Sequence, residues 1–166
     1  LSFGLMNKTA IFPGSFSPFT LGHKSVVDRA LPLFDKIIIA IGINSEKNEY
    51  FSIEERKQWI KAIYKDNSKI AVESYEGLTV DLCELVGANY IVRGLRDSHD
   101  FKYEKNIAQT NTDLNDKVET IFIITHGAIS HISSSIIRDI IKNGGDVSQF
   151  LPKQINLYAF KSLKHK

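Results

Sequence analysis

Short apolar runs alternate with longer segments of mixed polarity along most of the chain. The run KIIIAIGI over 36–43 is continuous and β-branched, which is typical of strands buried on both faces of a parallel sheet. Comparable runs predict four further strands. The predicted strands cover 9–12, 36–43, 69–75, 89–94 and 118–125.

The segments between these strands carry apolar residues at helical spacing. Ser52 and Glu55 have the spacing of a capping box, in which the serine caps a helix and the glutamate reaches back to its start. Gly87 and the pair Gly144-Gly145 are typical of helix ends. The predicted helices cover 22–34, 53–64, 78–86, 98–114 and 133–145, and a terminal helix is expected over 150–166.

The repeated order of strand and helix implies right-handed crossovers and an open, doubly wound parallel sheet. We therefore expect an α/β fold with a five-stranded parallel sheet, in a single domain that ends in the C-terminal helix. A chain of 166 residues is about the size of one ordinary domain. We interpret residues 1–5 as a remnant before the natural start at Met6, and residues 6–166 as the domain.

The composition is that of a globular protein. The chain is 43% hydrophobic and 24% charged, and no apolar run approaches the roughly 18 residues that a membrane-spanning helix needs. Lys plus Arg exceed Asp plus Glu by only 21 − 19 = 2, too few for a nucleic-acid coat. The single cysteine, Cys83, lies in an apolar helical pattern and is expected to be buried. Without a signal-peptide pattern, we expect a cytoplasmic protein that binds neither membrane nor nucleic acid.

The candidate chemistry lies in the loops after the predicted strands. In open parallel sheets, ligands bind beyond the carboxyl ends of the strands, where the strand order reverses. Four of these loops carry residues suited to phosphate. They read PGSFSPFTLGH after the first strand, NSEKN with Lys47 after the second, RGLR after the fourth and HGAISHISSS after the fifth.

The first of these loops joins a strand to a helix start that could bind an anion. Gly14 lets the backbone approach a ligand closely, and Ser15 offers a hydroxyl and an N–H. Gly22 and His23 stand where the helix begins, and the exposed N–H groups and helix dipole there attract phosphate. The alternative is that Thr20 only caps the helix while His23 is solvated.

Two other loops carry arginines and hydroxyls. Arg93 ends a strand and Arg96 follows across Gly94, so both guanidinium groups could face one ligand. Three successive serines at 133–135 exceed what one N-cap needs and are suited to cradling phosphate. The alternatives are a surface ion pair for the arginines, a redundant cap for the serines and a solvent-facing side chain for Lys47.

Several other chemistries lack their motifs. The sequence has neither G-x-x-x-x-G-K-[ST] nor G-x-G-x-x-G. His126 and His131 do not have zinc-ligand spacing, and we expect no metal site made by the protein. Ser130 and the serines at 133–135 lack the nucleophile elbow of serine hydrolases. What remains is phosphate chemistry without a protein nucleophile.

Five short motifs together resemble one known family. Two of them are similar to the [HT]-x-G-H and I-S-S-S signatures of the nucleotidyltransferase superfamily. The motifs are P-G-S-F at 13–16, T-L-G-H at 20–23, R-G-L-R at 93–96, D-F-K-Y-E at 100–104 and I-S-S-S at 132–135. Over about residues 8–158 the chain resembles the bacterial phosphopantetheine adenylyltransferases, which implies a Rossmann-like form of the doubly wound sheet.

The resemblance implies an activity and partners. Members of the family transfer an adenylyl group reversibly from ATP to 4′-phosphopantetheine, which yields dephospho-coenzyme A and pyrophosphate. This is the penultimate step of coenzyme A biosynthesis. The family needs Mg²⁺, carried by the ATP phosphates, and works as a cytoplasmic homohexamer. Dephospho-coenzyme A or coenzyme A is therefore expected as product or inhibitor.

The resemblance also implies roles for particular residues. His23 would be the catalytic residue that stabilises charge at the ATP α-phosphate. Ser15, Lys47, Thr79 and Arg93 would hold the phosphopantetheine, with Thr79 along its pantetheine arm. The residues implied in ATP binding are Ser15, Phe16, His23, Gly94, Leu95, Arg96, Glu104, Ile129, Ser130, His131, Ile132, Ser133, Ser134 and Ser135.

Two other functions remain open. One is a sibling transferase that acts on another phosphorylated acceptor, such as glycerol 3-phosphate or nicotinamide mononucleotide. The other is a catalytically silent module that binds a nucleotide or coenzyme A. The chain also departs from the family pattern: Ser17 stands where aspartate is common, and Thr79 where a bulkier apolar residue is expected. These departures bear on the pantetheine arm and not on the reaction class.

Overall fold

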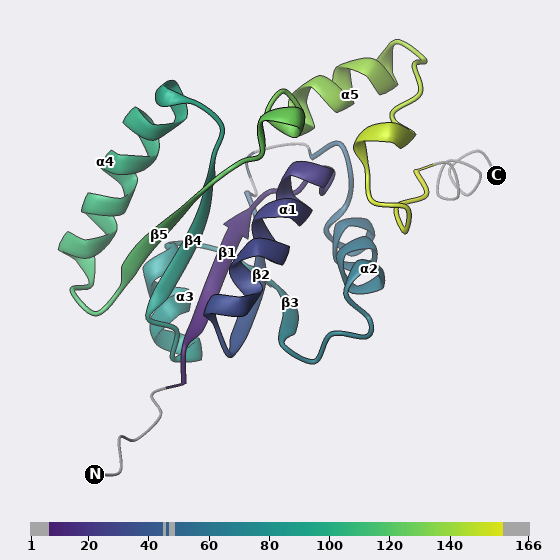
Figure 1. Ribbon diagram of the computed structural model, residues 1–166. Helices are drawn as coiled ribbons and strands as arrows, with labels where there is room; N and C mark the ends of the chain where they lie inside the picture. The colour runs from purple at the N-terminus through teal and green to yellow at the C-terminus, as the bar shows by residue number, and fades with distance from the viewer. Residues whose placement is uncertain (1–6, 45, 47–48, 158–166) are drawn as a thin grey trace.

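Five parallel strands form one sheet in the computed structural model, which describes residues 7–44, 46 and 49–157 (Figure 1). The strands are β1 (Thr9–Gly14), β2 (Lys36–Gly42), β3 (Ile70–Tyr75), β4 (Tyr90–Leu95) and β5 (Glu119–Ile124). Their order is β3-β2-β1-β4-β5, and every neighbouring pair is parallel. The predicted α/β fold with a doubly wound sheet is confirmed. The order reverses between β1 and β4, where sheets of this kind open a crevice.

Helices cover both faces of this sheet. They are α1 (Leu21–Ala30), α2 (Ile53–Ile63), α3 (Thr79–Val86), α4 (Ser98–Leu114) and α5 (Ser134–Lys142). In β2, Ile37, Ile39 and Ile41 belong to the core under α1 and α2, whereas Ile38 and Ala40 belong to the core under α3. Burial on both sides explains why the β2 sequence is continuously apolar. Figure 1 shows α4 beside β4 and β5, and α5 beyond the carboxyl edge of the sheet.

Local sequence signals set several of the helix ends. Ser52 and Glu55 form the predicted capping box: the Glu55 carboxylate accepts from the Ser52 N–H at 2.7 Å, and the Ser52 hydroxyl accepts from the Glu55 N–H at 3.2 Å. Gly87 ends α3 with φ +67°, in the left-handed region that favours glycine. These ends are specified by neighbours in the sequence.

Two helices differ from the prediction. The first is shorter, because α1 ends at Ala30 and a 3₁₀ turn containing Pro32 follows; proline has no N–H to continue the helical pattern. The predicted C-terminal helix is wrong over 151–157, where the chain is irregular. Leu151 and Ile155 pack into the core in that segment, so tertiary packing overrides helical spacing. The remaining part of that prediction, 158–166, lies outside the described residues, as do residues 1–5 and Met6.

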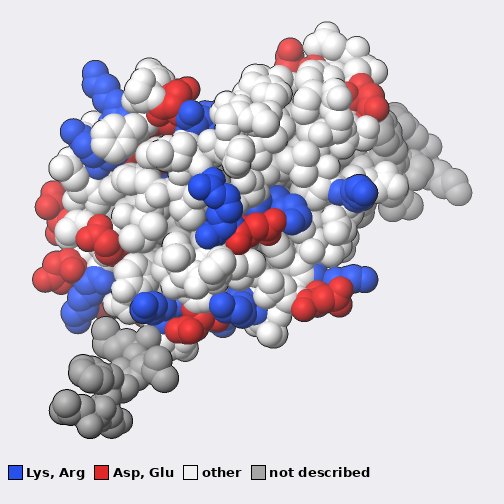
Figure 2. Space-filling model, viewed as in Figure 1, with Lys and Arg blue, Asp and Glu red and all other residues white. Residues whose placement is uncertain are grey.

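The surface and interior fit the composition. Figure 2 shows positive and negative side chains interspersed over the face in view. Within the described ranges, no helix is long and apolar enough to cross a membrane. Cys83 is fully buried in α3, as predicted, and burial raises the pKa of its thiol to about 11.

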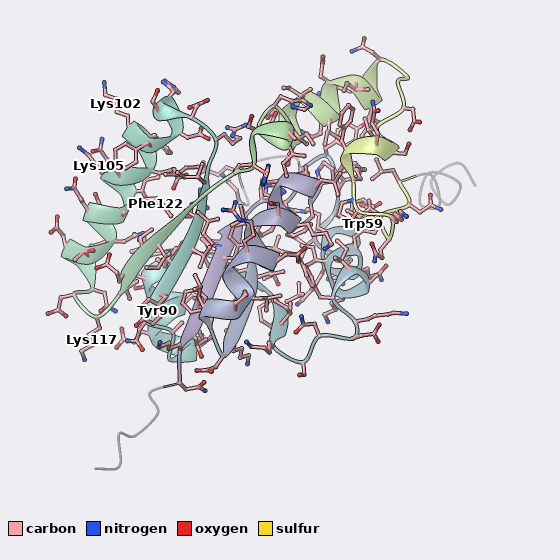
Figure 3. All side chains as sticks on the ribbon, in the orientation of Figure 1. Trp59, Tyr90, Lys102, Lys105, Lys117 and Phe122 are labelled. Atoms are coloured by element: carbon pink, nitrogen blue, oxygen red, sulfur yellow. The ribbon has the colours of Figure 1, made fainter. Side chains whose placement is uncertain are left out.

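Helix α4 buries a charge instead of an apolar stripe. Among its residues only Glu104 is buried, while Phe101 and Tyr103 are exposed. Lys102 and Lys105 point outward from it (Figure 3). A helix that turns a carboxylate toward the sheet needs a cation there, and that cation lies in the site.

Candidate active site

A cavity of about 300 Å³ opens at the carboxyl edge of the sheet, where the strand order reverses. Four segments make its walls: the end of β1 with the loop that follows, the first turn of α1, the end of β4 with the start of α4, and the start of α5. Three of the four sequence motifs that follow strands therefore meet in one place.

A capping box between Thr20 and His23 closes the first turn of α1. The Thr20 hydroxyl accepts a hydrogen bond from the His23 N–H at 3.3 Å, and the Thr20 N–H donates to Nδ1 of His23 at 2.9 Å. An Nδ1 that accepts from a backbone N–H is unprotonated, so Nε2 carries the proton. Because His23 lines the cavity, the group that it offers there is an N–H donor.

The His23 imidazole is held neutral. Burial is the largest cause, and the positive charges of Arg93 and Arg96 add to it, so that the pKa of His23 is lowered to about 3. The ring packs against Phe16 and Phe19, with centroid distances of 5.1 and 5.3 Å. Thr20 therefore caps the helix, as one alternative predicted, but His23 is packed and not solvated; its binding of an anion stays a prediction.

The loop after β1 is shaped by an unusual backbone turn. Phe16 has φ +48°, which is uncommon for a bulky residue and costs about 1–3 kcal/mol. Its ring is 2% exposed and lies 5.3 Å from the rings of both Phe12 and Phe19. A Cβ at Gly14 would lie 2.8 Å from this ring, so the packing requires glycine. The turn thus carries the aromatic ring inward and leaves Ser15 exposed at the cavity.

The two arginines of R-G-L-R each form a two-bonded ion pair with α4. Arg93 donates to both carboxylate oxygens of Glu104, at 2.8 and 2.6 Å, and to the Pro13 carbonyl at 2.6 Å. Arg96 donates to both oxygens of Asp100, at 2.8 and 3.1 Å. All four charged side chains line the cavity. The predicted alternatives combine here, because the arginines are ion-paired and also border the candidate anion site.

These ion pairs fix the charge states of the site. Burial disfavours the charge of Arg93, but the hydrogen bonds and charge of Glu104 outweigh it and raise the pKa of Arg93. Hydrogen bonds from Arg96 lower the pKa of Asp100. Both guanidinium groups are therefore charged and held in place at neutral pH.

Gly94 lets α1 approach the sheet closely. A Cβ at this position would lie 2.8 Å from Cγ2 of Val26 in α1. The absence of a side chain therefore sets how near the first turn of α1, with His23, comes to Arg93 in β4.

A second cavity of about 210 Å³ adjoins the first, and Arg93 and Glu104 line both. Its other walls come from α3, α4 and the strands β3, β4 and β5. Tyr75 and Thr79 share a hydrogen bond of 2.8 Å there, and Asn111 of α4 also lines it. The second cavity therefore offers hydroxyl and amide groups beside apolar side chains such as Ile91 and Ile107.

The three serines at the start of α5 have three different partners. Ser133 caps the helix by accepting from the Ile136 N–H at 3.2 Å. Ser134 donates to the Pro18 carbonyl at 2.8 Å, and Ser135 accepts from Arg138 at 3.1 Å. The serines are therefore not redundant caps. Ser133 and Ser134 line the first cavity.

The structure gathers most of the residues implied by the resemblance, and leaves some apart. Those that line the first cavity are Ser15, Phe16, His23, Arg93, Gly94, Arg96, Glu104, Ile132, Ser133 and Ser134. Thr79 lines the second cavity. Leu95, Ile129, Ser130, His131 and Ser135 line neither. Lys47 lies outside the described residues.

Sequence reasoning missed several residues of the site. Asn111 and Tyr75 line the second cavity but follow no motif. Arg138 and Arg56 donate hydrogen bonds to backbone carbonyls of the loop after β1. One signal could have found Arg56: with Trp59 it occupies the buried stripe of α2, where a charged residue is unexpected.

Comparison with known proteins agrees with this fold and site. A family model described as cytidylyltransferase-like matches residues 11–140. The chain belongs to this family, a class of nucleotidyltransferases built on a Rossmann-like sheet. The solved structures similar to it include a bifunctional NMN adenylyltransferase/ADP ribose pyrophosphatase from Francisella tularensis, with a TM-score of 0.68 at 19% identity. The match covers 96% of this chain but 49% of that one, and at this identity it shows the fold alone.

Similar sequences narrow the family further. A phosphopantetheine adenylyltransferase from Flavobacterium psychrophilum is 55% identical over 150 residues, which cover 90% of this chain and 99% of that protein. One from Bacteroides thetaiotaomicron is 48% identical over the same shares of the two chains. At this identity and coverage, the chain belongs to the phosphopantetheine adenylyltransferase family.

Proposed function

We propose that this protein transfers an adenylyl group from ATP to 4′-phosphopantetheine, with release of pyrophosphate and formation of dephospho-coenzyme A. The observation that carries the mechanism is the hydrogen bond from the Thr20 N–H to Nδ1 of His23, which leaves a neutral N–H donor in the cavity that Arg93 and Arg96 also line. The membership in the family supports the choice of substrates.

The reaction is a direct displacement at the ATP α-phosphorus. A phosphate oxygen of the acceptor forms a bond to this phosphorus while the bond to the bridging oxygen breaks, and pyrophosphate leaves with the electron pair. The acceptor phosphate is ionised at neutral pH, so no general base is required. Catalysis then consists of positioning and of charge stabilisation, which fits a site without a protein nucleophile.

The residues of the first cavity divide between the two substrates in this proposal. His23 donates from Nε2 to the α-phosphate, where negative charge builds up in the transition state. Arg96 and the start of α5, with Ser133 and Ser134, bind the nucleotide. Ser15, which lines the first cavity, contacts both phosphates.

The second cavity suits the acceptor. Arg93, which lines both cavities, binds the phosphate of phosphopantetheine, and Lys47 assists it. The amide-rich pantetheine arm then extends along the hydroxyl pair of Tyr75 and Thr79. Thr79 is polar where the family pattern led us to expect an apolar residue, and here its hydroxyl has a partner.

The acidic residues of the site bear on the Mg²⁺ requirement. Glu104 and Asp100 line the cavity, but both carboxylates are occupied by arginines. Among the described residues, no group of three or more acidic, histidine or cysteine side chains could hold a metal ion. This donor set fits a Mg²⁺ ion that arrives on the ATP phosphates, where it would offset their negative charge.

We infer a cytoplasmic homohexamer that releases dephospho-coenzyme A as its product and that dephospho-coenzyme A or coenzyme A inhibits. Supporting it, Ile124 at the end of edge strand β5 is 70% exposed and Tyr103 of α4 is 67% exposed, and a subunit contact would cover such large side chains. Light scattering of the purified protein tests the subunit number.

The test of the function is pyrophosphate release with ATP, Mg²⁺ and one acceptor at a time. We expect release with 4′-phosphopantetheine, and none with glycerol 3-phosphate, nicotinamide mononucleotide or no acceptor. Release with another acceptor would replace the substrate but keep the reaction. No release with any acceptor, while ATP binds, would indicate a silent binding module.

A further inference from the structure

Three alternate carbonyls, one near the end of β1 and two in the loop that follows it, each accept a hydrogen bond from an arginine. The donors come from three different elements, β4, α2 and α5. The pairs are Arg93 to Pro13 at 2.6 Å, Arg56 to Ser15 at 2.6 Å and Arg138 to Ser17 at 2.7 Å. The first donor lines the cavity, whereas neither of the other two does in the part of the chain that the structure describes.

Arg56 is the most buried of these donors. It is 1% exposed and lies on the core stripe of α2 with Trp59 and Ile60. Its Nη1–H donates to the Ser15 carbonyl, and its Nε–H donates to the Ser52 carbonyl at 3.3 Å. One guanidinium therefore ties the loop after β1 to the first turn of α2.

Burying the charge of Arg56 is energetically unfavourable, which suggests that the residue serves a function. Desolvation is the largest effect on its pKa and lowers it, although the charges of Glu49 and Glu55 oppose this. Within the described residues, no carboxylate lies within ion-pair distance of Arg56, and both of its hydrogen bonds go to backbone carbonyls. A buried charge without an ion-pair partner has a large desolvation cost, so Arg56 is not expected to be kept for stability alone.

The direction of the Ser15 carbonyl explains what the cation does. A carbonyl that accepts from a buried guanidinium points away from the cavity. A carbonyl oxygen turned into the cavity would repel a phosphate, whereas an N–H or hydroxyl attracts one. Ser15 itself is exposed at the cavity, so its hydroxyl stays free to face the substrates.

We propose that Arg56 is a positioning residue, which holds the Ser15 carbonyl away from the phosphates and so fixes the loop in its anion-binding form. This inference rests on the proposed function. Arg138 acts in the same way on the Ser17 carbonyl, but it is only partly buried and also bonds Ser135. Its contribution is therefore smaller.

The test compares Arg56→Met with Arg56→Lys and with a matched control, Lys61→Met. Lys61 lies on the exposed side of the same helix, so the control removes the same charge from the same element. For each variant we would measure kcat, the KM values for ATP and 4′-phosphopantetheine, the thermal midpoint and the hydrogen exchange of amides 14–17.

We expect kcat to fall by about 100-fold in Arg56→Met, the effect of a misplacement near 1 Å. The KM values should change less than kcat, and the thermal midpoint should stay close to that of the wild type or rise. Arg56→Lys keeps the charge but cannot span both carbonyls, so it should recover only part of kcat. Lys61→Met should match the wild type.

Other outcomes would overturn the inference. They are a kcat near the wild-type value in Arg56→Met, or full recovery by Arg56→Lys, which would make the charge alone sufficient. If the wild type itself releases no pyrophosphate, the proposed function fails, and the exchange of amides 14–17 still decides the inference. If amides 14–17 exchange faster in Arg56→Met than in the wild type, and Lys61→Met exchanges as the wild type does, Arg56 holds the loop in place. If Arg56→Met exchanges as the wild type does, the inference is refuted.

Discussion

Two helices of this protein begin with the same hydrogen-bonded motif and use it differently. In α2, Ser52 and Glu55 form a capping box at the surface, and Oε2 of Glu55 accepts from both the N–H and the hydroxyl of Ser52. In α1, Thr20 and His23 form the corresponding box at the cavity. The partners stand three residues apart in both.

The difference lies in which atoms of the second partner, Glu55 or His23, stay available after the capping bond is made. Glu55 ends in acceptors, and it serves only to close the helix. The imidazole of His23 accepts through Nδ1 and so must keep its proton on Nε2, opposite the box. A structural cap thereby fixes the tautomer of a donor that faces the cavity. The surroundings of the two boxes also differ, because Phe16 and Phe19 pack on the His23 ring and bury it.

The largest effect should come from removing the donor in α1. We expect His23→Ala to lower kcat by about 10²–10³-fold, the usual loss for one transition-state hydrogen bond. ATP binding should fall much less, because the donor acts on charge that builds up in the transition state. Steady-state kinetics and calorimetric ATP titration measure both. Equal losses in the two would mean that His23 only binds ATP.

Glutamine separates the cap from the donor, since it is a regular capping-box residue. We expect His23→Gln to keep the thermal midpoint near that of the wild type, and still to lose most of kcat. The matched variant Glu55→Gln should leave kcat unchanged. If His23→Gln were fully active, the box alone would suffice and the imidazole would have no special role.

A smaller effect should come from the cations beside the α1 box. In Arg93→Met combined with Glu104→Gln, which avoids leaving a buried carboxylate unpaired, KM for phosphopantetheine should rise about 10- to 100-fold through loss of a charged hydrogen bond. KM for ATP should change less. The pKa of His23 should also rise toward its usual value, because the charge of Arg93 contributes to lowering it. Equal effects on both KM values would contradict the assignment of Arg93 to the acceptor.

The position of the α1 box can be shifted from the sheet. Gly94→Ala places a Cβ 2.8 Å from Cγ2 of Val26, and overpacking of this kind costs about 1–3 kcal/mol. We expect a lower midpoint in denaturant titration and reduced kcat. A second change, Val26→Ala, should recover the activity more than the stability. If Gly94→Ala alone were fully active, the close approach of α1 to β4 would not matter for the site.

The smallest effect should come from the structural box. Glu55→Ala should lower the free energy of unfolding by about 1 kcal/mol, the usual loss for a cap. Its kcat should stay near the wild-type value, as denaturant titration and kinetics on the same sample would show. A large loss of kcat would indicate that the start of α2 communicates with the loop at Ser15.

The two capping boxes also differ in how far the sequence predicted them. The box of Ser52 and Glu55 was predictable, because both partners lie in one helical turn and need no distant neighbour. Thr20 and His23 have the same spacing, but sequence reasoning left a cap and an anion site as alternatives. The structure shows that Thr20 caps the helix and that two aromatic rings pack on His23, whereas the anion site stays a prediction. The strands were also predictable, because burial on both faces leaves continuous apolar runs.

The hydrogen bonds from Arg56 and Arg138 to the loop after β1 could not be predicted from the sequence. Arg138 and Ser17 are 121 residues apart, and no local pattern indicates that a guanidinium meets that carbonyl. The irregular segment at 151–157 was mistaken for a helix for a similar reason. Its apolar residues have a spacing that suits a helix, but packing on the core gives them another conformation.

The most direct test of the account is an NMR titration of the His23 ring nitrogens in the substrate-free protein. A pKa lowered from 6.5 to about 3 means that the folded protein disfavours protonation of His23. The contribution of the neutral His23 to stability is therefore complete above about pH 6.5 and is lost as the pH falls from there toward about 3. We expect a neutral ring with the proton on Nε2 throughout pH 5–8. A ring that titrates near pH 6.5, or that carries its proton on Nδ1, would contradict the claim that the capping box fixes His23 as a neutral donor.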